Sequence, residues 1–156
     1  MVDVVDPATR SRMMAGIRGK DTRPELLIRR ALHRAGFRFR VHDRRLPGAP
    51  DLILPKYRSA IFVHGCFWHR HDGCRYTTMP ATRAQFWEQK FSRNIARDRE
   101  NRAALNALGW RVLVVWECGV RHDPSDTIEL VASWLADGSE GACDHLPARP
   151  PRPAER

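Results

Sequence analysis

The fold is decided by one stretch of the chain, Asp51-Leu-Ile-Leu-Pro-Lys-Tyr-Arg-Ser-Ala-Ile-Phe-Val-His64. Its two apolar runs, at 51–54 and 59–63, are short and separated by a turn, which is typical of strands. A third run, Val112-Leu-Val-Val-Trp116, is apolar at successive positions and therefore on both faces. A strand of that kind is covered from both sides, so we expect a sheet buried between other elements.

Helical patterns surround these strands. Thr22-x-x-Glu25 fits a capping box and opens a helix that ends at Gly36. A long helix is predicted from a cap at Thr82 to about residue 108, before Gly109, and a final helix from 125 to 135. Asp6-Pro7 predicts a short basic helix that ends near residue 16. The sum is an α/β fold with a mixed sheet flanked by helices.

Three further segments are assigned from their local pattern. Phe37, Phe39 and Val41 alternate with arginines, which predicts a half-buried strand, and residues 46–50 form a turn. Residues 137–156 hold four prolines and few large apolar groups, so we expect a disordered Pro-rich tail. Residues 1–136 then form a single domain, which suits a chain of 156 residues.

The charge of the chain is high and clustered. The net charge is +9, and the segment from 8 to 50, with 12 basic and three acidic residues, accounts for all of it. A polyanionic partner follows, with nucleic acid favoured over an anionic membrane surface. Arginine makes up 24 of the 27 basic residues, and it suits bidentate phosphate contacts, although GC-rich codon usage explains the same ratio.

No apolar run approaches the length of a membrane span, and the acidic N-terminus does not fit a signal peptide. We therefore expect a protein of the reducing cytosol, where cysteines rarely form disulfides. Cys66-x4-His71-x2-Cys74, closed by Cys118 beyond the buried strand, predicts a four-coordinate Cys3His structural zinc site that staples the loop. Ordinary core cysteines, and a site that uses His64, His69 or Asp72, remain the alternatives. Cys143 lies in the tail and is taken as a bystander.

Asp51 and the strand that ends at His64 resemble the PD-(D/E)xK nuclease core, with Phe62 and His64 in place of the acid and the lysine. Over residues 6–135 the chain is similar to the very short patch repair (Vsr) endonucleases. The strings that carry the resemblance are Asp6-Pro-Ala-Thr-Arg-Ser11, Asp21-Thr22, Leu46-Pro-Gly-Ala-Pro-Asp51, Phe62-Val-His-Gly-Cys-Phe-Trp-His69, Phe86-Trp87, Asn94, Arg97-Asp98 and Gly109-Trp-Arg-Val-Leu-Val-Val-Trp-Glu-Cys118.

This resemblance implies a restriction-endonuclease-like fold and a magnesium-dependent enzyme. The family nicks the strand that carries the T of a T·G mismatch, 5' of that T, and this lesion arises when 5-methylcytosine deaminates. The expected partner is double-stranded DNA with such a mismatch, and the expected protein is a monomer. Recruitment by mismatch-repair proteins is left open.

The resemblance also assigns roles to residues. Asp51 and the main-chain carbonyl of Val63 bind Mg²⁺, and Glu25 reaches the ion through water, although a capping-box role with Thr22 explains Glu25 equally well. His69 activates the attacking water, and His64 lies beside the scissile phosphate. The implied zinc ligands are Cys66, His71, Cys74 and Cys118. A neutral imidazole is a suitable proton acceptor near pH 7.

Aromatic residues form the remaining group. By the resemblance, Phe67, Trp68 and Trp87 wedge into the duplex beside the mismatch, where unstacking is least costly. Core packing is the alternative for these three, and it is the assignment for Trp110, Trp116 and Trp134. The other residues expected to contact DNA are Lys90, Asn94, Arg10 and Arg12.

Two rival functions fit the sequence less well. A zinc-stapled DNA-binding module without catalysis would not need Asp51, His64 and His69 together. A restriction-type nuclease on the same core usually keeps the acid-x-lysine pair, which this chain lacks.

Overall fold

The computed structural model describes residues 21–138 and 145–147. Its centre is a five-stranded mixed sheet in the order β1-β2-β3-β4-β5. The first three strands pair antiparallel, whereas β3, β4 and β5 run parallel. The strands are β1 (Arg40–Val41), β2 (Leu52–Leu54), β3 (Ser59–His64), β4 (Arg111–Trp116) and β5 (His145–Leu146).

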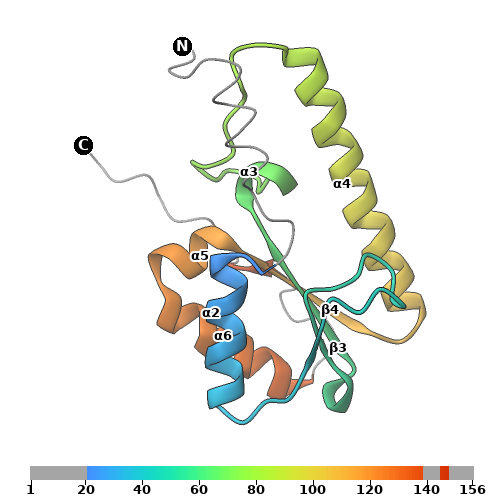
Figure 1. Cartoon of the computed structure of the whole chain (residues 1–156), viewed down its shortest axis with the longest axis vertical. Coiled ribbons are helices and arrows are strands. Elements are labelled where there is room, and N and C mark those ends of the chain that lie inside the picture. Colours follow the sequence, from blue (N-terminus) through green and yellow to red (C-terminus); the bar gives the residue numbers. More distant parts are fainter. Residues whose placement is uncertain (1–20, 139–144, 148–156) are drawn as a thin grey trace.

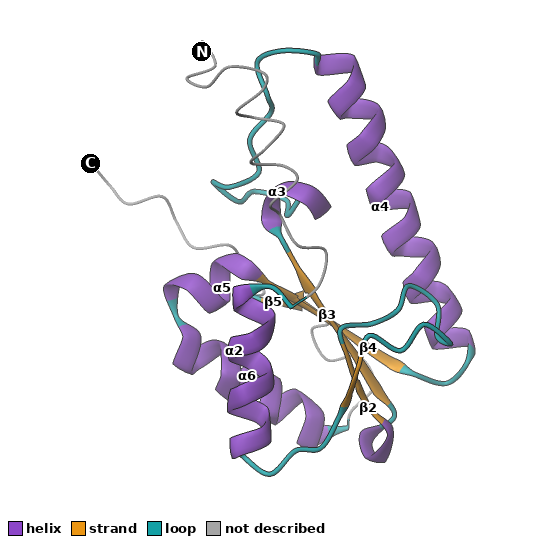
Figure 2. Ribbon diagram, viewed as in Figure 1, coloured by secondary structure: helices purple, strands orange, loops and turns teal. Residues whose placement is uncertain are grey.

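Helices cover both faces of this sheet (Figure 1). Three of them, α2, α5 and α6, pack together on one side, and the long α4 crosses the other (Figure 2). The short α3 lies where β3 ends. The helices are α2 (Arg23–Arg34), α3 (Cys66–His69), α4 (Ala84–Ala107), α5 (Glu117–His122) and α6 (Pro124–Asp137), and a 3-10 turn, η1 (Pro55–Tyr57), links β2 to β3.

Alternation along the strands divides the core in two. Ile61 packs in the layer formed with α2 and α6, whereas Ala60, its neighbour in β3, faces Leu105 of α4. Successive side chains of a strand point to opposite faces, and here both faces are covered. This explains why β3 is apolar at successive positions from 60 to 63 and β4 from 112 to 116, and it confirms the predicted α/β class.

Most predicted elements are confirmed. Thr22 caps α2 by accepting a hydrogen bond from the Glu25 amide, and the helix closes just before Gly36, whose φ of +100° favours glycine. The two strands of the opening stretch, the buried strand and the final helix also lie close to their predicted positions. Trp116 and Trp134 are buried, and Trp110 is half-buried against the Ile53 cluster.

Other expectations are corrected. The strand predicted from Phe37 shrinks to Arg40–Val41, since Phe37 and Phe39 pack on the core without joining the sheet. The N-cap of α4 is Arg83, not Thr82. The 64–80 loop contains α3, and α5 follows β4 at once. The predicted tail contributes β5, which pairs with β4, so the expectation of disorder does not hold at residues 145–146.

Some expectations fall on residues that the structure does not describe. The predicted N-terminal helix, Arg10, Arg12, Cys143 and most of the tail are among them. Among the described helices, none has the length and apolar character needed to cross a membrane.

Candidate active site and metal centre

Asp51 stands directly before β2, where the antiparallel pairing with β3 brings it to the far end of that strand. Leu52 is opposite Ile61 in this antiparallel pair, so the Asp51 side chain lies near the backbone of the residues after Ile61 in β3. Its Oδ2 accepts a hydrogen bond of 2.7 Å from the Val63 amide. The predicted pair of Asp51 and the Val63 main chain is therefore brought together.

The environment of the Asp51 carboxyl opposes its ionisation. Burial raises its pKa from the usual 3.8 to about 6, and the nearby carboxylate of Glu25 adds to the rise. The Val63 amide and the imidazoles of His42 and His69 act in the opposite direction. A divalent cation favours the carboxylate form. Binding of a cation beside Asp51 would therefore offset the cost of ionising this buried carboxyl group.

Glu25 approaches the same site from the first turn of α2. It is 1% exposed, and its Oε1 lies 2.8 Å from His42 Nε2 and 3.7 Å from Arg29. Neither contact is a well-aligned hydrogen bond, so Oε1 is a buried oxygen without such a partner among the described residues. A buried oxygen of this kind needs a polar partner, and a water of a hydrated cation fits the requirement.

Two histidines stack at the end of β3. The rings of His64 and His69 are 3.7 Å apart and 5° from parallel. His69 Nδ1 lies 2.7 Å from Asp98 Oδ2, from α4. With the Nδ1 proton donated to that carboxylate, the lone pair of His69 is on Nε2, the arrangement of an oriented proton acceptor.

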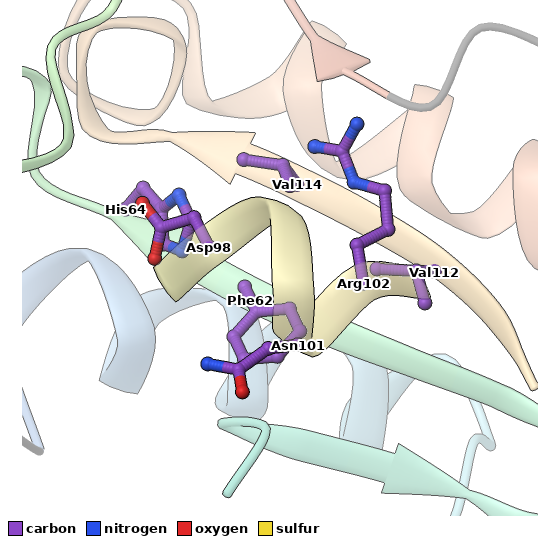
Figure 3. A pocket seen from close by; sticks show the side chains of 7 residues that line it. All are labelled: Phe62, His64, Asp98, Asn101, Arg102, Val112 and Val114. Carbon is purple, nitrogen blue, oxygen red and sulfur yellow. The ribbon is translucent and has the colours of Figure 1, made fainter. Parts of the chain in front are cut away.

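His64 is held neutral. Burial lowers its pKa well below 6.5, and the charges of His69, Arg102 and His145 act in the same direction. Figure 3 shows its ring beside Asp98 in a small cavity between α4 and the strands β3 and β4. The other residues that line the cavity are Phe62, Asn101, Arg102, Val112 and Val114, so it adjoins His64 and Asp98.

The four predicted zinc ligands converge. The ligand atoms of Cys66, His71, Cys74 and Cys118 all lie within 4.8 Å of one another, and all four residues are buried. His71 Nδ1 is 3.7 Å from Cys66 Sγ and 3.4 Å from Cys118 Sγ. Sulfur and nitrogen ligands of a tetrahedral zinc ion lie about 3.5 Å apart, so the donor set and its spacing fit zinc.

Strand register explains why these ligands meet. Parallel pairing sets His64 opposite Trp116, and each strand supplies a cysteine two residues later, Cys66 and Cys118. The Cys118 thiol and burial both raise the pKa of the Cys66 thiol above its usual range, and burial raises that of Cys74. Buried thiols so close together are stabilised as thiolates by a bound cation.

An aromatic cluster joins α3 to α4. Phe67 contacts Trp68, Trp87 and Phe91 with ring centroids 5.1 to 5.9 Å apart. Phe67 and Trp68 are half-buried, but Trp87 is only 7% exposed. Trp87 therefore packs beneath the other two, in place of the surface position expected of a wedge.

The other described residues expected to contact DNA lie on α4. The Lys90 ammonium sits 5.1 Å over the Trp68 ring. Asn94 Nδ2 donates to the Trp68 carbonyl at 3.1 Å, so it fixes α3 against α4. Four exposed basic residues recur with helical spacing on one side of α4, namely Arg83 at its N-cap, Lys90, Arg93 and Arg97, whereas the exposed Arg99 lies on another side.

The chain has close relatives. A family model described as DNA mismatch endonuclease Vsr matches residues 2–75. The chain is 49% identical over 137 residues to the DNA mismatch endonuclease Vsr of Escherichia coli (strain K12), with 88% of this chain and 87% of that protein covered. It is 49% identical over 118 residues to the type II nicking enzyme V.XorIIP of Xanthomonas oryzae pv. oryzae (strain KACC10331 / KXO85), covering 76% and 86%.

The chain belongs to the Vsr family. Membership makes it an endonuclease, a hydrolase that acts on DNA, and enzymes of this kind use divalent metal.

In this Vsr family member, the pairing of Asp98 with His69 was not predicted from the sequence. Asp98 lies on the packing face of α4, with Trp87, Phe91 and Leu105 at helical spacing. A carboxylate on the apolar face of a helix needs a buried partner, and that was the available signal. His42 gave no comparable signal, because its carboxylate contacts come from a distant segment.

Proposed function

We propose that this member of the Vsr family is a strand-specific endonuclease for T·G mismatches. It nicks the strand that carries the T, 5' of that T, at lesions left by the deamination of 5-methylcytosine. The observation that carries the proposal is a pair of contacts made by residues at and just after the end of β3: the Val63 amide with the Asp51 carboxylate, and His69 with Asp98. The relatives named as a mismatch endonuclease and as a nicking enzyme support the same reaction.

The proposed catalytic ion is Mg²⁺. Asp51 and the main-chain carbonyl of Val63 would hold it, with Glu25 reaching it through water. Oxygen donors are the ligands that Mg²⁺ prefers. When bound, such an ion neutralises charge on the phosphate and lowers the pKa of water.

The histidines have separate proposed roles. His69 accepts the proton of the attacking water at Nε2, and Asp98 orients the ring and stabilises its charged form. His64 stays neutral beside the scissile phosphate, because a second charge on a stacked ring would be repelled.

The second proposed ion is structural Zn²⁺, held by Cys66, His71, Cys74 and Cys118. It ties α3, which carries Phe67 and Trp68, to the end of β4. A non-catalytic DNA-binding module would need this staple, but it would not need an oriented His69–Asp98 pair. That pair favours the enzyme.

Further assignments complete the proposal. Residues 1–136 form one nuclease domain, residues 137–156 add the tail with β5, and the enzyme acts as a monomer. Its substrate is double-stranded DNA, so it works in the bacterial cytoplasm at the nucleoid. Mismatch-repair proteins are proposed as recruiting partners.

Cleavage of a panel of duplexes tests the function. Each duplex carries one T·G pair in a different flanking sequence, with the matched T·A duplex as control. We expect one Mg²⁺-dependent nick, in the T strand, about 100-fold faster than cleavage of the control, because the wedge unstacks a mispaired step at lower cost. Equal cutting of matched duplexes, or cutting of both strands, would contradict the proposal.

Replacing the half-buried Trp68 tests the wedge. Trp68→Ala should reduce the preference for T·G over matched duplex about 10-fold, since stacking on one base is worth about 1–3 kcal/mol. Overall binding should change less, because arginine and lysine contacts with phosphate remain. The measurement is binding and single-turnover nicking of both duplexes at two salt concentrations.

Trp110→Ala is the matched control for that experiment. This tryptophan packs against the Ile53 cluster, away from α3, so its loss should lower the melting temperature and leave the preference unchanged. If Trp68→Ala weakens both duplexes equally, Trp68 is a packing residue and the wedge assignment is wrong.

A further inference from the structure

We propose that His42 is a positioning residue that joins the two halves of the cation site. It holds the Glu25 carboxylate of α2 in place beside Asp51, which comes from the start of β2. This inference rests on the proposed function, in which Asp51 binds the catalytic ion.

One imidazole spans three carboxylates. His42 Nε2 lies 2.8 Å from Glu25 Oε1 and 3.3 Å from Asp21 Oδ1. On the other side of the ring, Nδ1 is 3.8 Å from Asp51 Oδ1. Asp21 precedes α2 and Glu25 lies in its first turn, whereas Asp51 directly precedes β2, so His42 contacts both sides at this point.

The backbone fixes the direction of the ring. His42 follows β1, and its amide donates to the Asp51 carbonyl at 3.4 Å. Its φ is +50°, in the left-handed region that residues other than glycine rarely adopt. The chain departs here from extended geometry, and this turn directs the side chain to α2.

Glu25 needs such a contact. Its other neighbour, Arg29, is one turn further along α2 and is engaged with Asp21 at 2.6 Å. Without the imidazole, the contact that remains to Glu25 Oε1 from this group is the Arg29 guanidinium at 3.7 Å, which lies on the same helix and gives no connection to Asp51. Groups that orient metal-site carboxylates typically contribute 10–100-fold to metal affinity or activity.

Three variants test the proposal: His42→Ala, His42→Gln and the control His33→Ala. Gln keeps N–H donors at about the reach of Nε2, whereas Ala removes them. His33 is an exposed histidine of α2 that lies against Phe39, so its replacement matches the chemical change without touching the carboxylates. The readouts are Mn²⁺ binding, from loss of the free-ion EPR signal, and the dependence of single-turnover nicking on Mg²⁺ concentration.

We expect His42→Ala to weaken Mn²⁺ binding and to raise the Mg²⁺ concentration for half-maximal nicking, each by about 10-fold or more. His42→Gln should recover most of both, and His33→Ala should behave as wild type. DNA binding measured without metal should stay within about twofold for every variant, because none of the substitutions removes an arginine or a lysine.

Two results would overturn the inference. Unchanged metal dependence in His42→Ala would show that Glu25 is held without the imidazole. Equal loss in the Ala and Gln variants would make His42 a direct ligand or a folding residue. Asp51→Asn is measured in parallel: if it binds Mn²⁺ and nicks like wild type, the proposed cation site itself is wrong, whatever His42 does.

Discussion

Asp51→Asn is expected to abolish nicking and, at neutral pH, to stabilise the fold. The amide oxygen can still accept the hydrogen bond from Val63, so the local backbone is kept. The variant loses the charged ligand of the proposed cation. Metal ions stabilise such transition states by several kcal/mol, so we expect the nicking rate to fall at least about 1000-fold.

The stability gain follows from the raised pKa of Asp51. A raised acid pKa stabilises the folded protein fully below pH 3.8, and this contribution is lost as the pH rises through about 6. The shift from 3.8 to about 6 corresponds to about 3 kcal/mol. Asn does not titrate, so its advantage over Asp should appear between pH 4 and 7 and then level off.

Urea unfolding of both proteins at pH 4 and pH 7.5, without divalent metal, measures this difference. Mg²⁺ should then stabilise the wild type at pH 7.5 and leave Asp51→Asn unchanged, since ligands stabilise the state that binds them. A variant that nicks normally would remove Asp51 from the cation site. A variant that is less stable than wild type at pH 7.5 would make Asp51 a structural residue.

Removal of the structural ion is expected to unfold much of the site. Cys118→Ser leaves three ligands, so the metal content should drop from about one equivalent to a small fraction. Binding free energy at such sites is folding free energy, and we expect a loss of several kcal/mol in stability. Atomic absorption and thermal unfolding, with and without a chelator, measure both effects.

Cys143→Ser is the matched control, because it makes the same chemical change at a cysteine that is not among the four predicted ligands. It should keep both the metal and the melting temperature. If purified wild type carries no zinc or similar metal, or if a chelator leaves its melting temperature unchanged, the four buried residues are ordinary core residues.

The elements of the fold followed from local chemistry. Thr22 offers an oxygen to the first turn of α2, Gly36 permits the turn that ends it, and both effects act within a few residues. The apolar strands were visible because burial on both faces removes any polar position. At Phe37, packing of the side chain against the core replaced the predicted strand pairing.

The strand β5 shows that composition alone does not predict every ordered segment of the tail. The Pro-rich tail has little to bury, yet Leu146 packs on the core beside β4. A two-residue strand has no periodicity from which to predict it. Its partner strand, far along the chain, supplies the hydrogen bonds and the apolar surface.

The sequence by itself determined the inventory of this protein: strands that must be buried, capped helices, a Cys3His ligand set and a family resemblance over most of the chain. Tertiary structure alone decided which side chains meet. Parallel register places Cys66 and Cys118 together, α4 delivers Asp98 to His69, and packing buries Trp87. The physical reason is the distance along the chain over which each effect acts. Caps, turns and periodicity act within a few residues. These contacts join segments that share no local signal, and they form because the strands pair in one register and α4 packs on the sheet.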